Sequence, residues 1–316
     1  MNFLEKFNES LTSLEDSLYK DYEEVFPNIF VLGLPRSGTT LLTQVIYNNL
    51  DVSCTNNLIA KFWRTPLVGT RLAMEAFAGK AQKMSSYTSD HGQTESISDP
   101  HEFSWYWQRM MQIDDIEKYD IQLASGKIDW FRLRNELLGM SHIMEKPLVH
   151  KPLELIGYHL ENFCQLFSKA IYISINRPLD QVALSLAQAR LKKFNDLNIW
   201  WGSYPPSKDY EQIKTLSPEK QIAGQVYFLN RMYQRNLTWI NPDSIVNIDF
   251  ADLLKRPNDI LTQIIEVAKK KGYTIRQLNE PQPFKSVKRD LSNDFGQKII
   301  KELNSFYEQD SNNTSA

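Results

Sequence analysis

The chain has 316 residues, of which 42% are hydrophobic and 23% are charged, and its formal net charge is -2. These values are typical of a soluble globular protein, and the small net charge excludes a global field that would recruit nucleic acid or an anionic membrane. The two cysteines, Cys54 and Cys164, exclude a disulfide framework and a cysteine metal cluster. No stretch is apolar enough for a membrane span and the N-terminus lacks a signal-peptide pattern, so we expect a cytoplasmic protein.

Apolar residues recur three or four positions apart over residues 2–25, with Glu and Lys between them. This spacing predicts an amphipathic helix. We expect the helix to pack on the domain rather than to bind a partner.

Residues 28–42 read NIFVLGLPRSGTTLL. The first half is typical of a strand buried on both faces, and a glycine turn and a helix follow it. The first N–H groups of a helix have no intrahelical partner and carry a partial positive charge, so this junction predicts an anion site. The expected donors are Arg36, Ser37, Gly38, Thr39 and Thr40.

Residues 100–107 place four aromatic side chains beside His101 and Glu102, after a polar, turn-rich stretch at 84–99. Such a cluster predicts a binding pocket. The alternative is the start of a helix, with Asp99 as N-cap and Glu102 in the first turn, which would explain the acid without any chemistry. The sequence leaves both interpretations open.

The rest of the chain alternates strands and helices. Strands are predicted at 147–152, 170–175 and 244–250, and helices at 130–144, 153–167, 179–192, 218–239 and 258–271. Repeated strand–helix units predict a mostly parallel sheet with right-handed crossovers. We therefore expect an α/β fold: a single P-loop-like, three-layer domain over residues 1–309, with helices on both sides of the sheet. Residues 193–216 are predicted to form an acceptor lid, and residues 310–316 a disordered tail.

The glycine spacing of the 33–38 loop is that of a Walker A motif, but the lysine that this motif requires after its second glycine is Thr39 here. An ordinary nucleoside triphosphatase or kinase is therefore not expected. Instead, Pro35-Arg36-Ser37-Gly38-Thr39-Thr40 resembles the 5′-phosphosulfate-binding loop of sulfotransferases, in the form carried by tyrosylprotein and many bacterial members. Taken alone, the segment is also compatible with a chance turn before a helix.

A second segment resembles the 3′-phosphate-binding segment of the same family. Arg177 follows the predicted strand at 170–175, and Ser185 lies on the next predicted helix. An arginine at the carboxyl end of a strand can fork onto a phosphate, although an ion pair with Asp180 is the alternative. Residues 245–257 are similar to a third family segment but keep only the last two residues of its Tyr-Glu-Asp-Leu pattern. Together the three segments identify the chain as a family member over about residues 28–260.

Two features of the cytosolic sulfotransferases are missing. The tryptophan that stacks on adenine in those proteins is replaced by Leu41, so adenine must be held by other groups. The C-terminal Arg-Lys-Gly phosphate clamp is not found. Lys285, Lys288 and Arg289 are candidate substitutes, and a solvated basic stretch is the alternative.

The resemblance implies in-line transfer of a sulfuryl group from 3′-phosphoadenosine 5′-phosphosulfate (PAPS) to an acceptor hydroxyl or amine. The product would be 3′-phosphoadenosine 5′-phosphate (PAP), and no metal is expected. Catalysis would rest on positioning and on charge stabilisation, with Arg36 neutralising the leaving phosphate. The residues implied for donor binding are Arg36, Ser37, Gly38, Thr39 and Thr40 at the 5′-phosphate, with Arg177 and Ser185 at the 3′-phosphate.

The general base is left open, because Lys151 is followed by Pro152 rather than by the family's Thr-His. Glu102 is preferred, since related sulfotransferases also use a glutamate. His101 comes next, and then His150, which strand alternation should point away from Lys151. Lys151 is expected either to contact the transferred group or to form a surface ion pair.

The expected acceptor is a carbohydrate or another small hydroxylated metabolite, bound by a stacking surface. That surface would consist of Trp105, Trp107, Trp200, Trp201 and Tyr204, for which the aromatic core is the alternative. Two other functions stay open: a small-molecule kinase with a degenerate loop, and a non-catalytic nucleotide-binding module. No nucleic-acid partner is expected, and the oligomeric state is left open.

Overall fold

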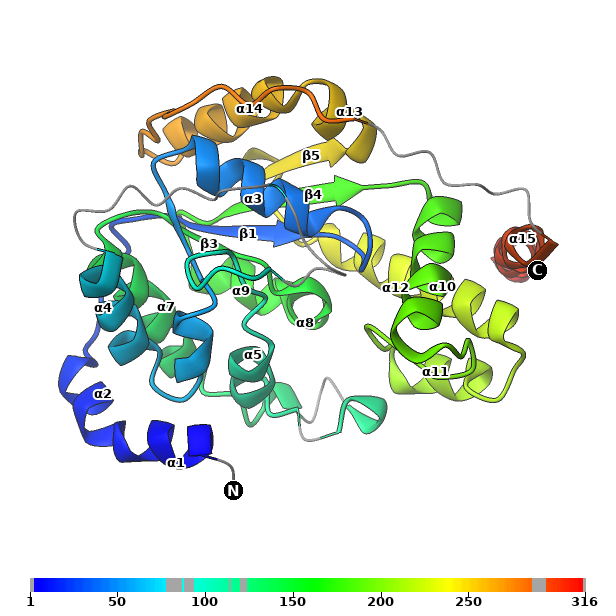
Figure 1. The fold of residues 1–316 in the computed structure, drawn as a ribbon, viewed down its shortest axis with the longest axis horizontal. Helices are drawn as coiled ribbons and strands as arrows, with labels where there is room; N and C mark the ends of the chain where they lie inside the picture. Colours follow the sequence, from blue (N-terminus) through cyan, green and yellow to red (C-terminus); the bar gives the residue numbers. More distant parts are fainter. Residues whose placement is uncertain are drawn as a thin grey trace.

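The computed structural model describes residues 3–77, 87, 94–113, 115–119, 124–285 and 294–314. In this part of the chain a five-stranded, wholly parallel sheet has the order β2-β3-β1-β4-β5 (Figure 1). The strands are β1 (Asn28–Leu32), β2 (Ser53–Cys54), β3 (Leu148–His150), β4 (Ile171–Asn176) and β5 (Ile245–Asp249). Because all pairs are parallel, the carboxyl ends of the strands share one edge, where ligands of open α/β sheets bind.

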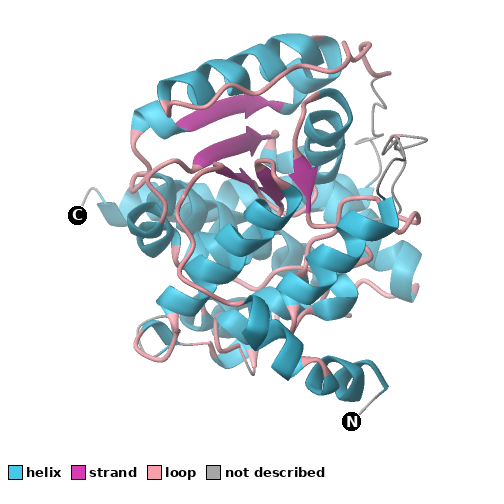
Figure 2. Cartoon of the chain, turned by 90° about the vertical axis from the view of Figure 1, so that its left-hand side faces the viewer, coloured by secondary structure: helices cyan, strands magenta, loops and turns pink. Residues whose placement is uncertain are grey.

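Side chains alternate between the two faces of the sheet. On β1, Phe30 and Leu32 belong to the larger apolar cluster, whereas Ile29 and Val31 belong to the smaller one. All four are fully buried, as expected for a strand covered on both sides. Helices lie on both faces (Figure 2). The predicted α/β fold with a parallel central sheet is therefore confirmed.

Helices α3 (Thr39–Asn49), α13 (Phe250–Lys255) and α14 (Pro257–Lys270) cover the face of the smaller cluster. The opposite face is covered chiefly by α7 (Trp130–Met144), α9 (Leu160–Leu166), α10 (Leu179–Phe194) and α12 (Pro218–Leu237). The other α-helices described are α1 (Phe3–Ser10), α2 (Thr12–Leu18), α4 (Pro66–Phe77), α5 (Ser104–Met110), α8 (Leu153–Tyr158), α11 (Ser207–Ile213) and α15 (Asp294–Thr314), and the short 3-10 helices are η1 (Ile59–Phe62), η2 (Ile116–Lys118) and η3 (Pro242–Ser244). None of the described helices has both the length and the apolar character needed to cross a bilayer.

The N-terminal segment forms two short helices, so the prediction of one helix over residues 2–25 is wrong. Helix α2 ends at Leu18, and Tyr22 donates its backbone N–H to Asn135 Oδ1 (2.9 Å). Buried polar side chains fix both helices. Asn8 bonds backbone groups at the end of η1, and Glu15 accepts two N–H groups from the first turn of α4. An apolar spacing carries no information about such contacts.

Helix α15 extends to Thr314, so residues 310–314 are helical and the prediction of a disordered tail from residue 310 is corrected there. Ile299 and Leu303 of α15 are buried against the larger cluster. The Phe306 ring stacks on Tyr227 of α12 (5.4 Å between centroids). This packing stabilises the middle of α15 despite the polar composition of the helix.

The predicted lid at 193–216 contains three parts: the end of α10, an irregular segment at residues 195–206, and helix α11. We call residues 195–206 the connecting segment. Trp200 and Tyr204 of this segment stack on each other (5.2 Å between centroids), and Tyr210 of α11 lies at 4.9 Å from Trp200. The lid function stays a prediction.

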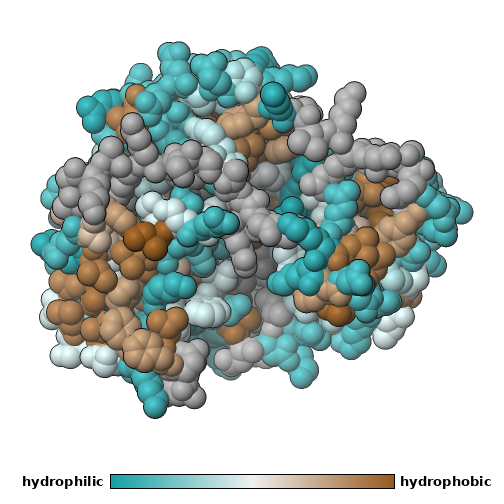
Figure 3. All heavy atoms as spheres, viewed as in Figure 1, coloured by the Kyte–Doolittle hydropathy of each residue, from teal (hydrophilic) through white to brown (hydrophobic). Residues whose placement is uncertain are grey.

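Exposed large apolar side chains occur on the helices of the N-terminal third and on α5. They include Phe3, Leu14, Leu72 and Trp105. Figure 3 shows apolar surface on this side of the molecule, at the lower left of the view.

Candidate active site

The loop between β1 and α3 makes a tight turn at the carboxyl edge of the sheet. Ser37 donates its N–H to the carbonyl of Leu34 (3.1 Å), and both Arg36 (φ 70°) and Gly38 (φ 107°) have left-handed backbones. A Cβ at Gly38 would lie 2.5 Å from the Phe250 ring. Glycine is therefore required at position 38 both by its backbone angle and by the close approach of Phe250. A non-glycine residue such as Arg36 in this region is strained, as is common at functional sites.

The loop has the donors that an anion needs. The Ser37 hydroxyl is buried, and among the described residues it has no hydrogen-bond partner. A buried polar group without a partner is costly, so a ligand atom there would be stabilising. Helix α3 begins at Thr39, and the N–H groups of its first turn have no intrahelical partner. The residues present therefore fit a bound phosphate group.

The carboxyl end of β4 reaches the same loop. Arg177, which follows β4, donates from Nη1 to the backbone carbonyl of Arg36 (3.0 Å) and from Nε to Gln181 (3.3 Å). Arg36 in turn donates from Nε to the Ser185 hydroxyl of α10 (3.1 Å). The two arginines and Ser185 are thus brought together. The Arg177 guanidinium also lies over the Phe250 ring, 4.5 Å from its centroid.

A third strand end, that of β3, adds a buried cation. The Lys151 side chain is 1% exposed, and its Nζ contacts both Thr40 Oγ1 (2.9 Å) and Glu102 Oε1 (2.9 Å). The Glu102 side chain is 33% exposed. Lys151 is therefore not a surface residue. It links residues 33–40, which we call the anion-binding loop after the sequence prediction, to an acid that solvent can reach.

Glu102 does not cap a helix, so the capping interpretation is wrong. Pro100 pairs with Asn56 in an antiparallel bridge, and the His101 N–H donates to the Thr55 carbonyl (2.8 Å). Helix α5 begins only at Ser104. Pairing with residues beyond β2 therefore keeps residues 100–102 out of the helix and carries Glu102 to Lys151.

The two histidine candidates are already engaged. His101 Nδ1 accepts the Phe103 N–H (2.8 Å), and burial lowers the pKa of His101, so its ring is neutral with the proton on Nε2. His150 is buried, and its ring nitrogens contact Asn28 Oδ1 (2.9 Å) and Thr55 Oγ1 (3.2 Å). Burial lowers the pKa of His150 to about 3. Neither ring presents an open acceptor nitrogen toward the loop.

The family model described as sulfotransferase family matches residues 27–270 of the chain. The chain belongs to the sulfotransferase family. The family inferred from the loop motif is thereby confirmed. No curated protein sequence matches the chain.

Several solved structures resemble this sulfotransferase at low sequence identity. Sulfotransferase STF1 from Mycobacterium tuberculosis H37Rv has a TM-score of 0.49 and 12% identity, over 94% of this chain and 75% of its own. Sulfotransferase STF9 from Mycobacterium avium has a TM-score of 0.44 and 12% identity, over 96% and 72%. The sulfotransferase domain from the curacin biosynthetic pathway has a TM-score of 0.43 and 16% identity, over 87% and 83%.

The five aromatic residues expected to form a stacking surface do not gather in one place in this sulfotransferase. Trp107 is buried in the core, and Trp105 packs edge-on against Trp63 (4.8 Å between centroids). Trp200 stacks on Tyr204 within the connecting segment. Trp201, the fifth, lies over Arg36. A common acceptor platform built from all five residues is therefore wrong.

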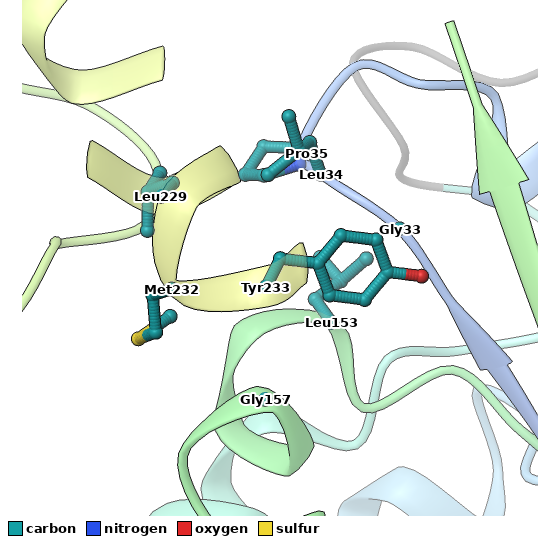
Figure 4. A pocket seen from close by; sticks show the side chains of 8 residues that line it. All are labelled: Gly33, Leu34, Pro35, Leu153, Gly157, Leu229, Met232 and Tyr233. Carbon is teal, nitrogen blue, oxygen red and sulfur yellow. The ribbon is translucent and has the colours of Figure 1, made fainter. Parts of the chain in front are cut away.

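Figure 4 shows a small pocket of the sulfotransferase, lined by residues of the loop after β1, of α8 and of α12. Its lining is Gly33, Leu34, Pro35, Leu153, Gly157, Leu229, Met232 and Tyr233. Pro35 directly precedes Arg36, and Leu153 lies two residues after Lys151. The pocket is therefore an apolar neighbour of the charged residues at the strand ends.

Sequence reasoning missed two contributors to the site of the sulfotransferase. Phe250 contacts both Gly38 and Arg177, and the only signal for it was its place directly after β5, at the same sheet edge. Trp201 was assigned to the acceptor surface rather than to the loop arginine. Of the candidate substitutes for the C-terminal clamp, Lys285 is exposed, and Lys288 and Arg289 lie outside the described residues. Within the described residues no cluster of His, Cys, Asp and Glu could hold a metal ion.

Proposed function

We propose that this sulfotransferase moves a sulfuryl group from PAPS to a hydroxyl of a carbohydrate or another small acceptor, with PAP as the second product. The observation that carries the proposal is the contact between two separate strand ends, where Arg177 bonds the backbone of Arg36. A donor with a phosphate at each end of its ribose needs cationic groups at two points, and these arginines supply them from one edge of the sheet.

The anion-binding loop would hold the 5′-phosphate. Its donors are the first-turn N–H groups of α3 with the side chains of Ser37, Thr39 and Thr40, and Gly38 lets the backbone approach closely. The orphaned Ser37 hydroxyl supports this role. Arg177 and Ser185 would hold the 3′-phosphate. The Phe250 ring contacts the Arg177 guanidinium and lies close to Gly38, so it would help to fix both residues.

Two cations would stabilise the transfer. Arg36 would neutralise charge that develops on the bridging oxygen and the leaving phosphate, while Lys151, held by Thr40, would face the transferred group. Preorganised donors of this kind cost no reorganisation during the reaction, and removing one typically costs about 3–4 kcal/mol of transition-state stabilisation.

Glu102 is the proposed general base. It is the candidate whose carboxylate is open to solvent beside Lys151, and so it can meet an acceptor hydroxyl that approaches the transferred group. His101 is a weaker candidate because its Nδ1 lone pair is occupied by the Phe103 N–H. His150 is enclosed by Asn28 and Thr55.

The acceptor would approach Lys151 from the solvent side, where the Glu102 carboxylate is accessible. We further propose a cytoplasmic enzyme, consistent with its two free cysteines.

The experiment that tests the function compares ligands and then measures turnover. PAP is expected to raise the melting temperature by a few degrees at saturating concentration, whereas ATP is not. Incubation with PAPS and a panel of sugars and small alcohols should give a product heavier by one sulfuryl group, detected by mass spectrometry. Arg36→Ala should lower turnover by a factor of about 100–1000 while the ligand-free melting temperature stays unchanged.

Each contrary result has its own meaning. Protection by ATP with transfer of phosphate would establish the kinase alternative. Binding of PAP without transfer to any acceptor would favour the non-catalytic module. Near-normal turnover of Arg36→Ala would show that Arg36 does not stabilise the transfer.

A further inference from the structure

Trp201 of the connecting segment lies beside the arginine of the anion-binding loop. The Arg36 guanidinium carbon is 5.9 Å from the centre of the Trp201 ring, and Lys193 Nζ is 5.5 Å from the same centre. The Arg36 guanidinium is also bonded through Nε to Ser185. The loop arginine is therefore fixed by a hydrogen bond on one side and approached by an aromatic ring from a distant part of the chain.

The backbone of Trp201 is hydrogen-bonded to α12. Gln225 donates from Nε2 to the carbonyls of Trp201 (3.1 Å) and Ser203 (2.7 Å). Gln225 is fully buried, as is Arg190, which donates from Nη2 to Gln225 Oε1 (2.9 Å). The amide of Gln225 is thus oriented by Arg190, so that its two N–H bonds face the connecting segment.

Arg190 holds a second point of the same segment. Its Nη1 donates to the Leu197 carbonyl (3.0 Å) and to Gln221 Oε1 (3.2 Å), and its guanidinium lies 5.1 Å from the centre of the Trp200 ring. Burial lowers the pKa of Arg190 to about 10, so the group is still charged at neutral pH. Burying a cation on neutral acceptors is expensive, and here the bonds it makes fix the path of residues 197–203.

Helix α10 contributes three residues to this arrangement. Ser185, Arg190 and Lys193 all lie on α10, which follows the strand end that bears Arg177. The helix therefore places the hydrogen-bond acceptor of Arg36, the anchor of the connecting segment, and a second cation at the Trp201 ring. These contacts depend on one another, since the ring can meet Arg36 only while the segment is anchored.

We propose that Trp201 is a positioning residue for Arg36, held in place by Arg190 through Gln225. A planar guanidinium is attracted to an aromatic face, which restricts its rotamers before the donor arrives. Less freedom is then lost on binding, so the preorganised arginine binds phosphate more tightly. The proposal rests on the proposed function, because PAP is its probe.

A double-mutant cycle on PAP affinity, measured by calorimetry, tests the direct link. Trp201→Leu should weaken PAP binding roughly 3- to 10-fold, and Trp201→Phe should restore most of the loss. In an Arg36→Lys background, Trp201→Leu should add less than about 2-fold, because the planar partner is already gone. Trp239→Leu is the matched control, since Trp239 is 53% exposed at the end of α12.

The outcomes distinguish failure of the proposed function from failure of the positioning role of Trp201. Absence of PAP binding by the unmodified protein would overturn the proposed function. Normal PAP affinity of Trp201→Leu, or an equal loss in both backgrounds, would overturn the positioning role while leaving the function intact. If Trp201→Leu lowers PAP affinity only in proportion to a lowered melting temperature, Trp201 acts through stability, and the positioning role is likewise overturned.

Gln225→Glu tests the anchor without emptying the core. The carboxylate keeps an acceptor for Arg190 and pairs its charge, but it cannot donate to the carbonyls of Trp201 and Ser203. PAP affinity should fall by a factor similar to that of Trp201→Leu, with a melting temperature within a few degrees of the original. Adding Trp201→Leu to this variant should have little further effect. Unchanged PAP affinity in Gln225→Glu would show that the anchor does not control the ring.

Discussion

Lys151 shows how one buried charge can organise a reaction site. Its ammonium group is almost wholly removed from water, and it is bonded to a hydroxyl of the anion-binding loop and to the carboxylate of Glu102. A buried lysine needs such partners, because an unpaired charge there would be strongly destabilising. In the proposed function the same cation would also face the transferred group, so one side chain would serve both structure and chemistry.

Glu102→Gln separates these two roles. The amide oxygen can still accept from Lys151, so the fold and PAP affinity should be unchanged, whereas kcat should fall by a factor of about 100–10,000 if the carboxylate takes the acceptor's proton. Steady-state kinetics and calorimetry measure both effects. Glu95→Gln, at an exposed carboxyl of the preceding loop, is the control and should be neutral. Wild-type turnover in Glu102→Gln would assign the base elsewhere.

At the scale of elements, the sequence predicted the helices and strands whose formation depends on neighbouring residues. Helix α7 and the strand–loop–helix units around Arg36 and Arg177 are confirmed. The sequence left Glu102 between a cap and a pocket, because the bridge between Pro100 and Asn56 that excludes the cap joins distant segments. The contact of Trp201 with Arg36 was not predicted for the same reason: the position of Trp201 depends on Gln225, on another helix. The single-domain boundary at residue 309 stays a prediction.

The contact between α2 and α4 should depend on pH through Glu15. Burial raises the pKa of Glu15 to about 7, above its ordinary value of 4.5. Between these values the unfolded chain holds fewer protons than the folded one, so the contribution of Glu15 to the free energy of unfolding falls as pH rises from about 4.5 to about 7.

Each unit of pKa difference corresponds to about 1.4 kcal/mol. Urea unfolding of Glu15→Gln should therefore show a flatter pH dependence than the unmodified protein across this window. Parallel curves for the two proteins would mean that Glu15 does not titrate in it.

Across the whole molecule, helix α15 contributes to the apolar core rather than to the candidate site at the strand ends. The site residues follow the strand ends, whereas α15 packs against α12 through side chains such as Leu303 and Phe306. Substitutions on the side of α15 that packs on α12 should therefore change stability without changing the affinity of the folded protein for its donor.

Leu303→Ala tests this separation. Leu303 is 4% exposed, and truncating a buried leucine usually costs about 2–5 kcal/mol. The melting temperature should fall accordingly, while PAP affinity measured well below it stays the same. Leu278→Ala, at a side chain that is 48% exposed, should change neither quantity much. A loss of PAP affinity in Leu303→Ala, measured well below its melting temperature, would show that α15 is coupled to the site.

The hydrogen bonds at the sheet edge join parts of the chain that are far apart in sequence. Arg177 and Arg36 are separated by 141 residues, and Lys151 and Thr40 by 111. A nucleotide bound among these residues would contact the ends of three neighbouring strands, β3, β1 and β4. In the proposed function, a fragment that lacks either half of the chain would lose part of this site, so donor binding would require both halves to be synthesised and folded.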